Sequence, residues 1–167
     1  MTTTATRYDR RMYAVMNNRE AAALYATAGR RRVLVGVHLA LTAGGLGAFF
    51  GVGGVPGALT MVALLLPWVV ATGAINGATR GLLELRGRML DERQLVERDR
   101  VRSLAHRLTG WLLIGGTAVV VLLAAYTDVD LSGLAAPLMV AVLALHLLTP
   151  LWVAGLRVQD EPSGDEN

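Results

Sequence analysis

Four long apolar runs stand out along this chain of 167 residues. The runs cover residues 33–55, 57–79, 108–127 and 131–156, and none of them contains Asp, Glu, Lys or Arg. Each run has about the 20 residues that a helix needs to cross a hydrocarbon core of about 30 Å. The pattern predicts an all-α, polytopic membrane protein with four transmembrane helices in two hairpins and cytoplasmic helical extensions.

The polar segments divide the chain into five parts of one structural unit. We expect a cytoplasmic or interfacial amphipathic helix in 1–32, a transmembrane hairpin in 33–79, a cytoplasmic helical loop in 80–107, a second hairpin in 108–156 and a tail in 157–167. Two positions for the first helix stay open. It lies on the membrane surface, or it packs on the central loop.

The arginines predict which way the chain crosses the membrane. All sixteen basic residues are Arg, as is typical of GC-rich bacterial genomes, and all lie in the first, central and last polar segments. The two connectors at 53–57 and 128–130 carry no positive charge. Because Lys and Arg accumulate on the cytoplasmic side, we expect a bacterial plasma-membrane protein with both termini in the cytoplasm.

Three polar side chains inside the runs are costly to expose to lipid: His38, Asn76 and His146. At 1.5 Å per helical residue, His38 and Asn76 reach similar depths, which favours a hydrogen bond between them. The two histidines are also candidates for haem or metal ligands, or for a protonatable site. Interhelical hydrogen bonding is the simpler interpretation, and we expect no cofactor and no metal. The absence of Cys excludes thiolate ligands and disulfides.

Small residues recur every four positions in the first two runs. These stripes are Gly36, Ala40, Gly44 and Ala48 in the first run and Gly73, Gly77 and Gly81 in the second. Such spacing lets helix backbones approach closely. The stripes therefore face each other within the first hairpin, or they face a second copy of the chain in a homo-oligomer.

The central polar segment contains a helix start. Asp91 followed by Gln94 has the spacing of a capping box, and we expect the helix that begins there to continue into the third run. The second run is expected to extend inward to about Met89, with Glu84 and Arg88 forming a pair four residues apart.

The helix that starts at Asp91 carries a basic face, formed by Arg93, Arg98, Arg100, Arg102 and Arg107. Three interpretations remain open: a solvated surface with salt bridges, contact with anionic lipid of the bilayer, and docking of a protein partner. Direct binding of nucleic acid is not expected.

The stretch Leu90-Asp91-Glu92-Arg93-Gln94 between two membrane hairpins resembles small four-span bacterial, especially actinobacterial, membrane proteins of unknown function. Members of that group often carry Asp-Glu-Arg-Glu/Gln in the cytoplasmic loop. The resemblance implies a partner among small helix-turn-helix regulators, which the membrane protein would sequester.

No catalytic motif accompanies these features: the chain has no G-x-S-x-G, no H-E-x-x-H and no phosphate-binding glycine loop. We therefore expect a non-enzymatic integral membrane protein that serves as a regulatory or accessory subunit. Two alternatives are a small oligomeric channel or transporter component, and a haem-binding protein or other membrane enzyme.

Overall fold

The computed structural model describes residues 5–18, 25, 27–128 and 131–157, and its described part contains helices and turns but no strand. The longer helices are α1 (Arg7–Met16), α3 (Ala28–Gly47, continued by a π-helical turn over Ala48–Val52), α4 (Gly54–Ala78), α5 (Glu92–Tyr126) and α6 (Ala135–Arg157). Short 3-10 turns cover Gly87–Met89 and Ser132–Leu134. Helices α3 to α6 are each long and apolar enough to cross a membrane. The predicted all-α fold with four spans in two hairpins is confirmed.

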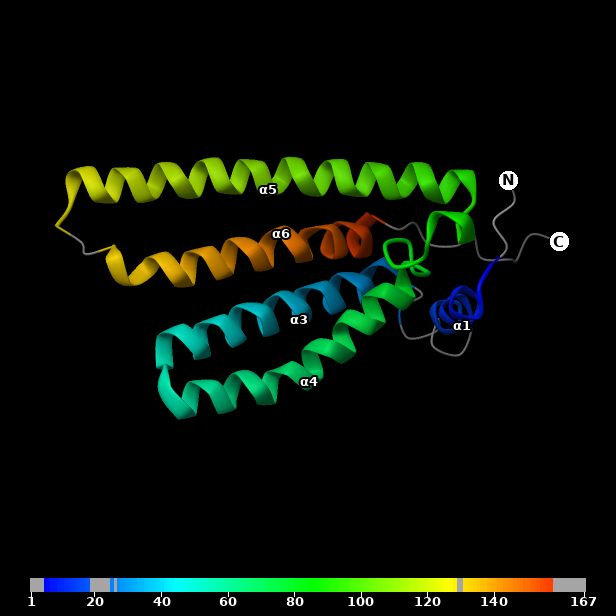
Figure 1. Cartoon of the computed structure of the whole chain (residues 1–167), viewed down its shortest axis with the longest axis horizontal. Coiled ribbons are helices and arrows are strands. Elements are labelled where there is room, and N and C mark those ends of the chain that lie inside the picture. Colours follow the sequence, from blue (N-terminus) through cyan, green and yellow to red (C-terminus); the bar gives the residue numbers. More distant parts are fainter. Residues whose placement is uncertain (1–4, 19–24, 26, 129–130, 158–167) are drawn as a thin grey trace.

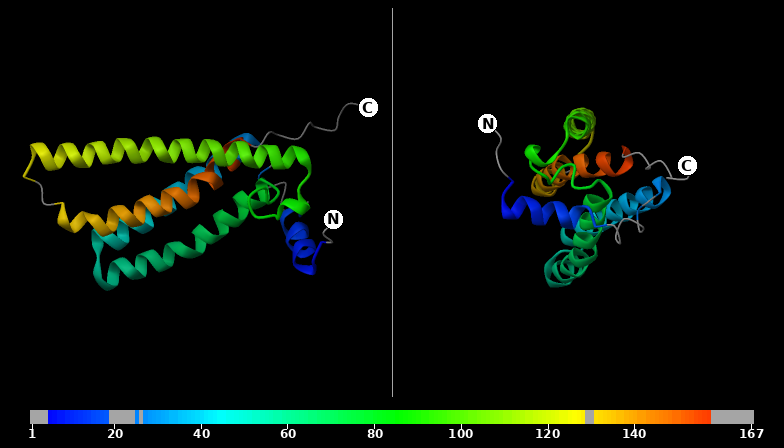
Figure 2. Two further views of the ribbon diagram at one scale, coloured as in Figure 1. Left: turned by 45° about the horizontal axis from the view of Figure 1, so that its top comes forward. Right: turned by 90° about the vertical axis from the view of Figure 1, so that its right-hand side faces the viewer.

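The two hairpins lie side by side, with α6 between α5 and the first hairpin (Figure 1). Helices α3 and α4 pack on each other, α6 contacts both of them, and α5 packs on α6. Helix α1, the segment 79–91 and the end of α6 gather at one end of the bundle (Figures 1 and 2). We call this the arginine-rich end.

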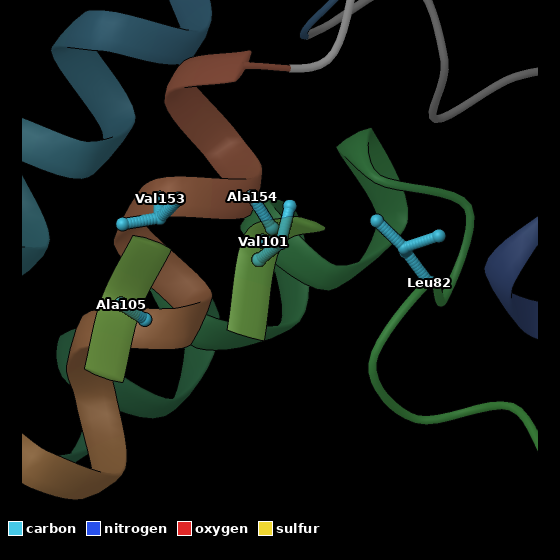
Figure 3. Close-up of a cluster of buried hydrophobic side chains, with 5 residues drawn as sticks. All are labelled: Leu82, Val101, Ala105, Val153 and Ala154. Atoms are coloured by element: carbon cyan, nitrogen blue, oxygen red, sulfur yellow. The ribbon is translucent and has the colours of Figure 1, made fainter. Parts of the chain in front are cut away.

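The packed core is concentrated at the arginine-rich end. One cluster consists of Leu82, Val101, Ala105, Val153 and Ala154, and Figure 3 shows how α5, α6 and the segment after α4 contribute to it. A second cluster consists of Val35, Ile75, Leu151 and Trp152. At the opposite end the side chains of α5 are mostly exposed, as is expected of surfaces that face lipid.

Helix α5 begins as its sequence predicts. The Asp91 carboxylate accepts from the Gln94 backbone N–H at 2.7 Å, and the Gln94 side chain accepts from the Asp91 N–H at 3.0 Å. This capping box satisfies two donors at the helix start. The helix then continues without interruption to Tyr126, which confirms that one helix joins the central segment to the third span.

The expected inward extension of the second span to Met89 is wrong, because α4 ends at Ala78. Arg80 and Gly81 adopt positive φ angles of 52° and 69°. The Gly81 N–H donates to the Asn76 carbonyl at 2.8 Å, and the Arg80 N–H donates to the Gly77 carbonyl at 2.9 Å. These two bonds form a Schellman motif, which satisfies carbonyls that the helix end leaves free.

Helix α1 occupies only part of the segment 1–32 in which we expected a helix, and it lies across the arginine-rich end (Figure 2). It ends at Met16, and residues 19–24 and 26 of the expected helix lie outside the described residues. Met16 packs against Gly81, where an added Cβ would lie 2.9 Å from the Met16 side chain. Tyr8 and Val15 are exposed. Helix α1 therefore packs on the end of α4 and on Gly81 and Arg88 of the central loop, which is one of the two positions that the sequence left open.

The glycine stripes do not face each other along their length. A Cβ built on Gly36 or on Gly73 meets no atom within 4 Å. Gly77 instead lies against the Tyr25 hydroxyl, 2.6 Å from where a Cβ would stand. The expected stripe-on-stripe packing is thus wrong at these positions, and the homo-oligomer stays a prediction.

Candidate functional site

His38 is the centre of a buried hydrogen-bond network that joins α3, α4 and α6. Its side chain is fully buried. Nε2 lies 2.9 Å from the Thr72 hydroxyl of α4, and Nδ1 accepts from the Trp152 indole N–H of α6 at 2.9 Å. Trp68 stacks on the imidazole at 4.9 Å and donates to the Thr42 hydroxyl, which in turn donates to the His38 carbonyl. Three helices are thereby linked through one imidazole.

The donors around His38 determine its protonation state. An indole N–H can only donate, so Nδ1 of His38 must be an unprotonated acceptor. The Thr72 hydroxyl gives its own proton to the Trp68 carbonyl at 2.8 Å, which leaves its lone pairs to accept from Nε2–H. His38 is therefore neutral, with its proton on Nε2, and both ring nitrogens are occupied.

Asn76 does not bond to His38, and that prediction is wrong. Its side-chain amide donates to the Glu84 carboxylate at 3.3 Å, while its buried Oδ1 has no partner. Thr72, one turn earlier on α4, occupies the place that we expected for Asn76. Helical rise gives the depth of a residue along its helix, but it does not give the direction in which the side chain points.

His146 lies away from this network. It is exposed, and it lines a crevice of about 190 Å³ between α5 and α6. His38 and His146 thus belong to separate sites. Within the described residues, no group of three or more His, Asp or Glu is arranged to hold a metal ion.

The basic face of α5 divides into two kinds of residue. Arg93, Arg100, Arg102 and Arg107 are exposed, whereas Arg98 is half-buried. The Arg98 guanidinium donates to the Leu85 carbonyl at 3.5 Å and lies over Gly87. Arg98 therefore holds the segment 79–91 against α5, and it is not available to a partner.

A shallow groove of about 430 Å³ lies beside α5 at the arginine-rich end. Its lining is basic and apolar with two further polar residues: Arg100, Arg107, Arg157, Val96, Leu104, Asp99 and Ser103. Arg157 was not among the predicted site residues. Its position directly after the last apolar run was the available signal, because that position brings it to the same end of the bundle as the start of α5.

Asp9 of α1 forms an ion pair that the sequence did not reveal. Asp9 is 2% exposed, and its carboxylate accepts from Nε of Arg88 at 2.9 Å. The expected pair between Glu84 and Arg88 is therefore wrong, since Arg88 bonds to Asp9. The pKa of Asp9 is lowered from 3.8 to about 2, chiefly by the Thr6 backbone N–H. The Thr6 hydroxyl and the Arg88 guanidinium lower this pKa further, against burial, which raises it.

No protein-family model, curated protein or solved structure matches this chain. The resemblance that rests on Leu90 to Gln94 therefore stays a prediction. The structure gives those residues a local role, because Asp91 and Gln94 form the cap of α5.

Proposed function

We propose that this multi-pass protein is a non-enzymatic accessory or regulatory subunit of a bacterial plasma membrane. Its arginine-rich end lies in the cytoplasm and binds an acidic segment of a protein partner. The groove formed by Arg100, Arg107 and Arg157 beside Val96 and Leu104 is the observation that carries this proposal.

The chemistry of the groove suits an amphipathic acidic helix. Three guanidinium groups supply fork-shaped donors that match carboxylates, and the two aliphatic side chains offer a surface for apolar residues. Asp99 adds one negative charge to the lining of the groove. A basic residue of the partner helix would pair with Asp99 and so fix the position of that helix along the groove. A helix-turn-helix regulator is the partner class that the sequence resemblance implies.

Preorganisation favours binding at this groove. Val101 and Ala105 are buried in the core on the side of α5 that faces α6, and Arg98 ties the same helix to the segment 79–91. The backbone of α5 is then already ordered when a partner binds, so that only side chains of the groove lose conformational freedom.

The orientation is tested with single cysteines, which the natural chain lacks. Ser103→Cys lies in the groove, and Asp128→Cys lies at the opposite end of the bundle. In intact spheroplasts, a membrane-impermeant maleimide should label only the cysteine at 128, and both should react after lysis. Labelling of the cysteine at 103 in intact spheroplasts would contradict the cytoplasmic placement.

Docking is tested by placing a photo-crosslinking amino acid at Ser103 in living cells. We expect one defined protein adduct, which disappears when Arg100→Gln and Arg107→Gln are combined. Arg93→Gln is the matched control, because Arg93 is an exposed arginine of α5 outside the groove. An adduct that survives the double substitution, or one that forms only with lipid, would reject the protein partner.

A further inference from the structure

We infer that the crevice between α5 and α6 binds the phosphate group of an anionic phospholipid, whose acyl chains follow the two helices toward the opposite end. The crevice shares no lining residue with the partner groove. The inference is therefore independent of the proposed function.

The lining of the crevice is suited to an anion. Arg102 and His106 stand one helical turn apart on α5, and Ala105 and Thr109 complete that wall. The guanidinium of Arg102 is always protonated, which favours a negative ligand and disfavours a metal cation beside the histidines. The volume of about 190 Å³ is several times the share of about 30 Å³ that a water molecule has in the liquid. It accommodates a headgroup and not a whole lipid.

The α6 wall adds an acceptor that a headgroup hydroxyl can use. Pro150 lies inside α6 and has no N–H to donate to the carbonyl four residues before it. That carbonyl belongs to His146, which lines the crevice together with Pro150. A phosphate flanked by a hydroxyl, as in phosphatidylglycerol, matches both the donors of α5 and this acceptor.

The depth of the crevice points to a lipid rather than to a soluble anion. Pro150 lies seven residues before Arg157, which is about 10 Å along the helix. Pro150 belongs to the apolar run of α6, whereas Arg102 and His106, which line the same crevice on α5, are polar. A basic pocket between spanning helices at this level is a known kind of headgroup site, and the charge of Arg102 would otherwise be costly to expose to lipid.

Apolar surface continues outward from the crevice on both helices. Leu113 follows Thr109 by one turn of α5, and Leu143 and Met139 precede His146 by one and two turns of α6. All three are exposed and provide contact for an acyl chain.

The test compares two lipids with identical acyl chains, phosphatidylglycerol and phosphatidylcholine, on the purified full-length protein in detergent by native mass spectrometry. We expect one phosphatidylglycerol per chain to be retained after phosphatidylcholine has been stripped. Arg102→Gln combined with His106→Gln should weaken that retention about tenfold or more, since charge-assisted hydrogen bonds are lost. Arg93→Gln, the exposed arginine outside the crevice, should leave it unchanged.

Three results would overturn the inference: equal retention of the two lipids, unchanged retention in the double variant, or occupancy by inorganic phosphate alone that excludes the lipid. Because both substituted side chains are exposed, the variant should fold, which far-UV circular dichroism checks. If the double variant does not fold, Arg102→Gln alone gives the same comparison.

Pro150→Ala restores an N–H donor, and it should reduce the preference for phosphatidylglycerol over phosphatidic acid. An unchanged preference would refute the role of the His146 carbonyl.

Discussion

Replacement of Trp152 by Phe tests the buried network around His38. Phe keeps an aromatic ring in the position that packs on Val35 and Ile75, but it removes the indole N–H that donates to Nδ1 of His38. Trp152 is 8% exposed and His38 is fully buried. Nδ1 is therefore left without a donor in a place that water does not reach.

The size of the effect follows from that burial. An orphaned buried acceptor costs about 1–3 kcal/mol in soluble proteins. Interhelical hydrogen bonds in membranes average about 0.6 kcal/mol with a maximum near 1.7 kcal/mol, because the unfolded chain in the membrane finds other partners. The two ranges overlap between about 1 and about 1.7 kcal/mol, so we expect the free energy of unfolding to fall by that amount. This corresponds to roughly a 5–18-fold change in the ratio of folded to unfolded protein.

The loss in free energy of unfolding can be measured by reversible unfolding in mixed micelles. Far-UV circular dichroism follows the unfolding as the mole fraction of dodecyl sulfate rises. Trp111→Phe is the matched control, since Trp111 is 69% exposed on α5. A double-mutant cycle with His38→Phe separates the hydrogen bond from ring packing. A coupling energy near zero would refute the hydrogen-bond argument, and so would a nitrogen NMR shift that places the His38 proton on Nδ1.

Two further predictions concern other contacts. Gly57→Ala would put a Cβ 2.5 Å from the Ala48 carbonyl oxygen, which belongs to the backbone and cannot rotate away. We expect a loss of about 1–3 kcal/mol, as in overpacked cores, and the same micelle titration should show no loss for Gly73→Ala, where the space is open. Asp9→Asn should release α1, seen as faster amide hydrogen exchange in Arg7–Met16. Because the folded pKa of Asp9 is lowered from 3.8 to about 2, docking of α1 in the natural chain should be complete above pH 4 and lost as the pH falls toward 2. Exchange rates in α1 that do not differ between the natural chain and the Asn variant would contradict the role of Asp9.

The spans and the start of α5 were predictable because their signals are local. An uninterrupted apolar run of about 20 residues predicts a membrane-spanning helix. The capping box at Asp91 is formed by residues within one helical turn, so its spacing can be recognised in the sequence. The end of α4 was not predictable in this way. Its Schellman motif at Arg80 and Gly81 is accompanied by packing of Met16, which comes from a distant part of the chain.

The sites show the same division between local and distant information. His38 and His146 were visible in the sequence as polar residues within apolar runs. Their partners were not, because Trp152 stands 114 residues from His38 and the direction of a side chain depends on how the helices are rotated. The arginines of α5 were visible as a basic face, yet the sequence could not reveal that Arg98 is committed to the Leu85 carbonyl.

The concentration of the core at one end has a consequence for how the protein responds to its host membrane. A thicker or thinner bilayer is accommodated by tilting helices and shifting their ends, at a modest cost per ångström of mismatch. Here the tips near Gly53 and Asp128 carry few buried side chains, and they can move apart or together with little loss of packing. The geometry around His38 and Arg100 is then insulated from the tips, and the same surface is presented in membranes of different thickness.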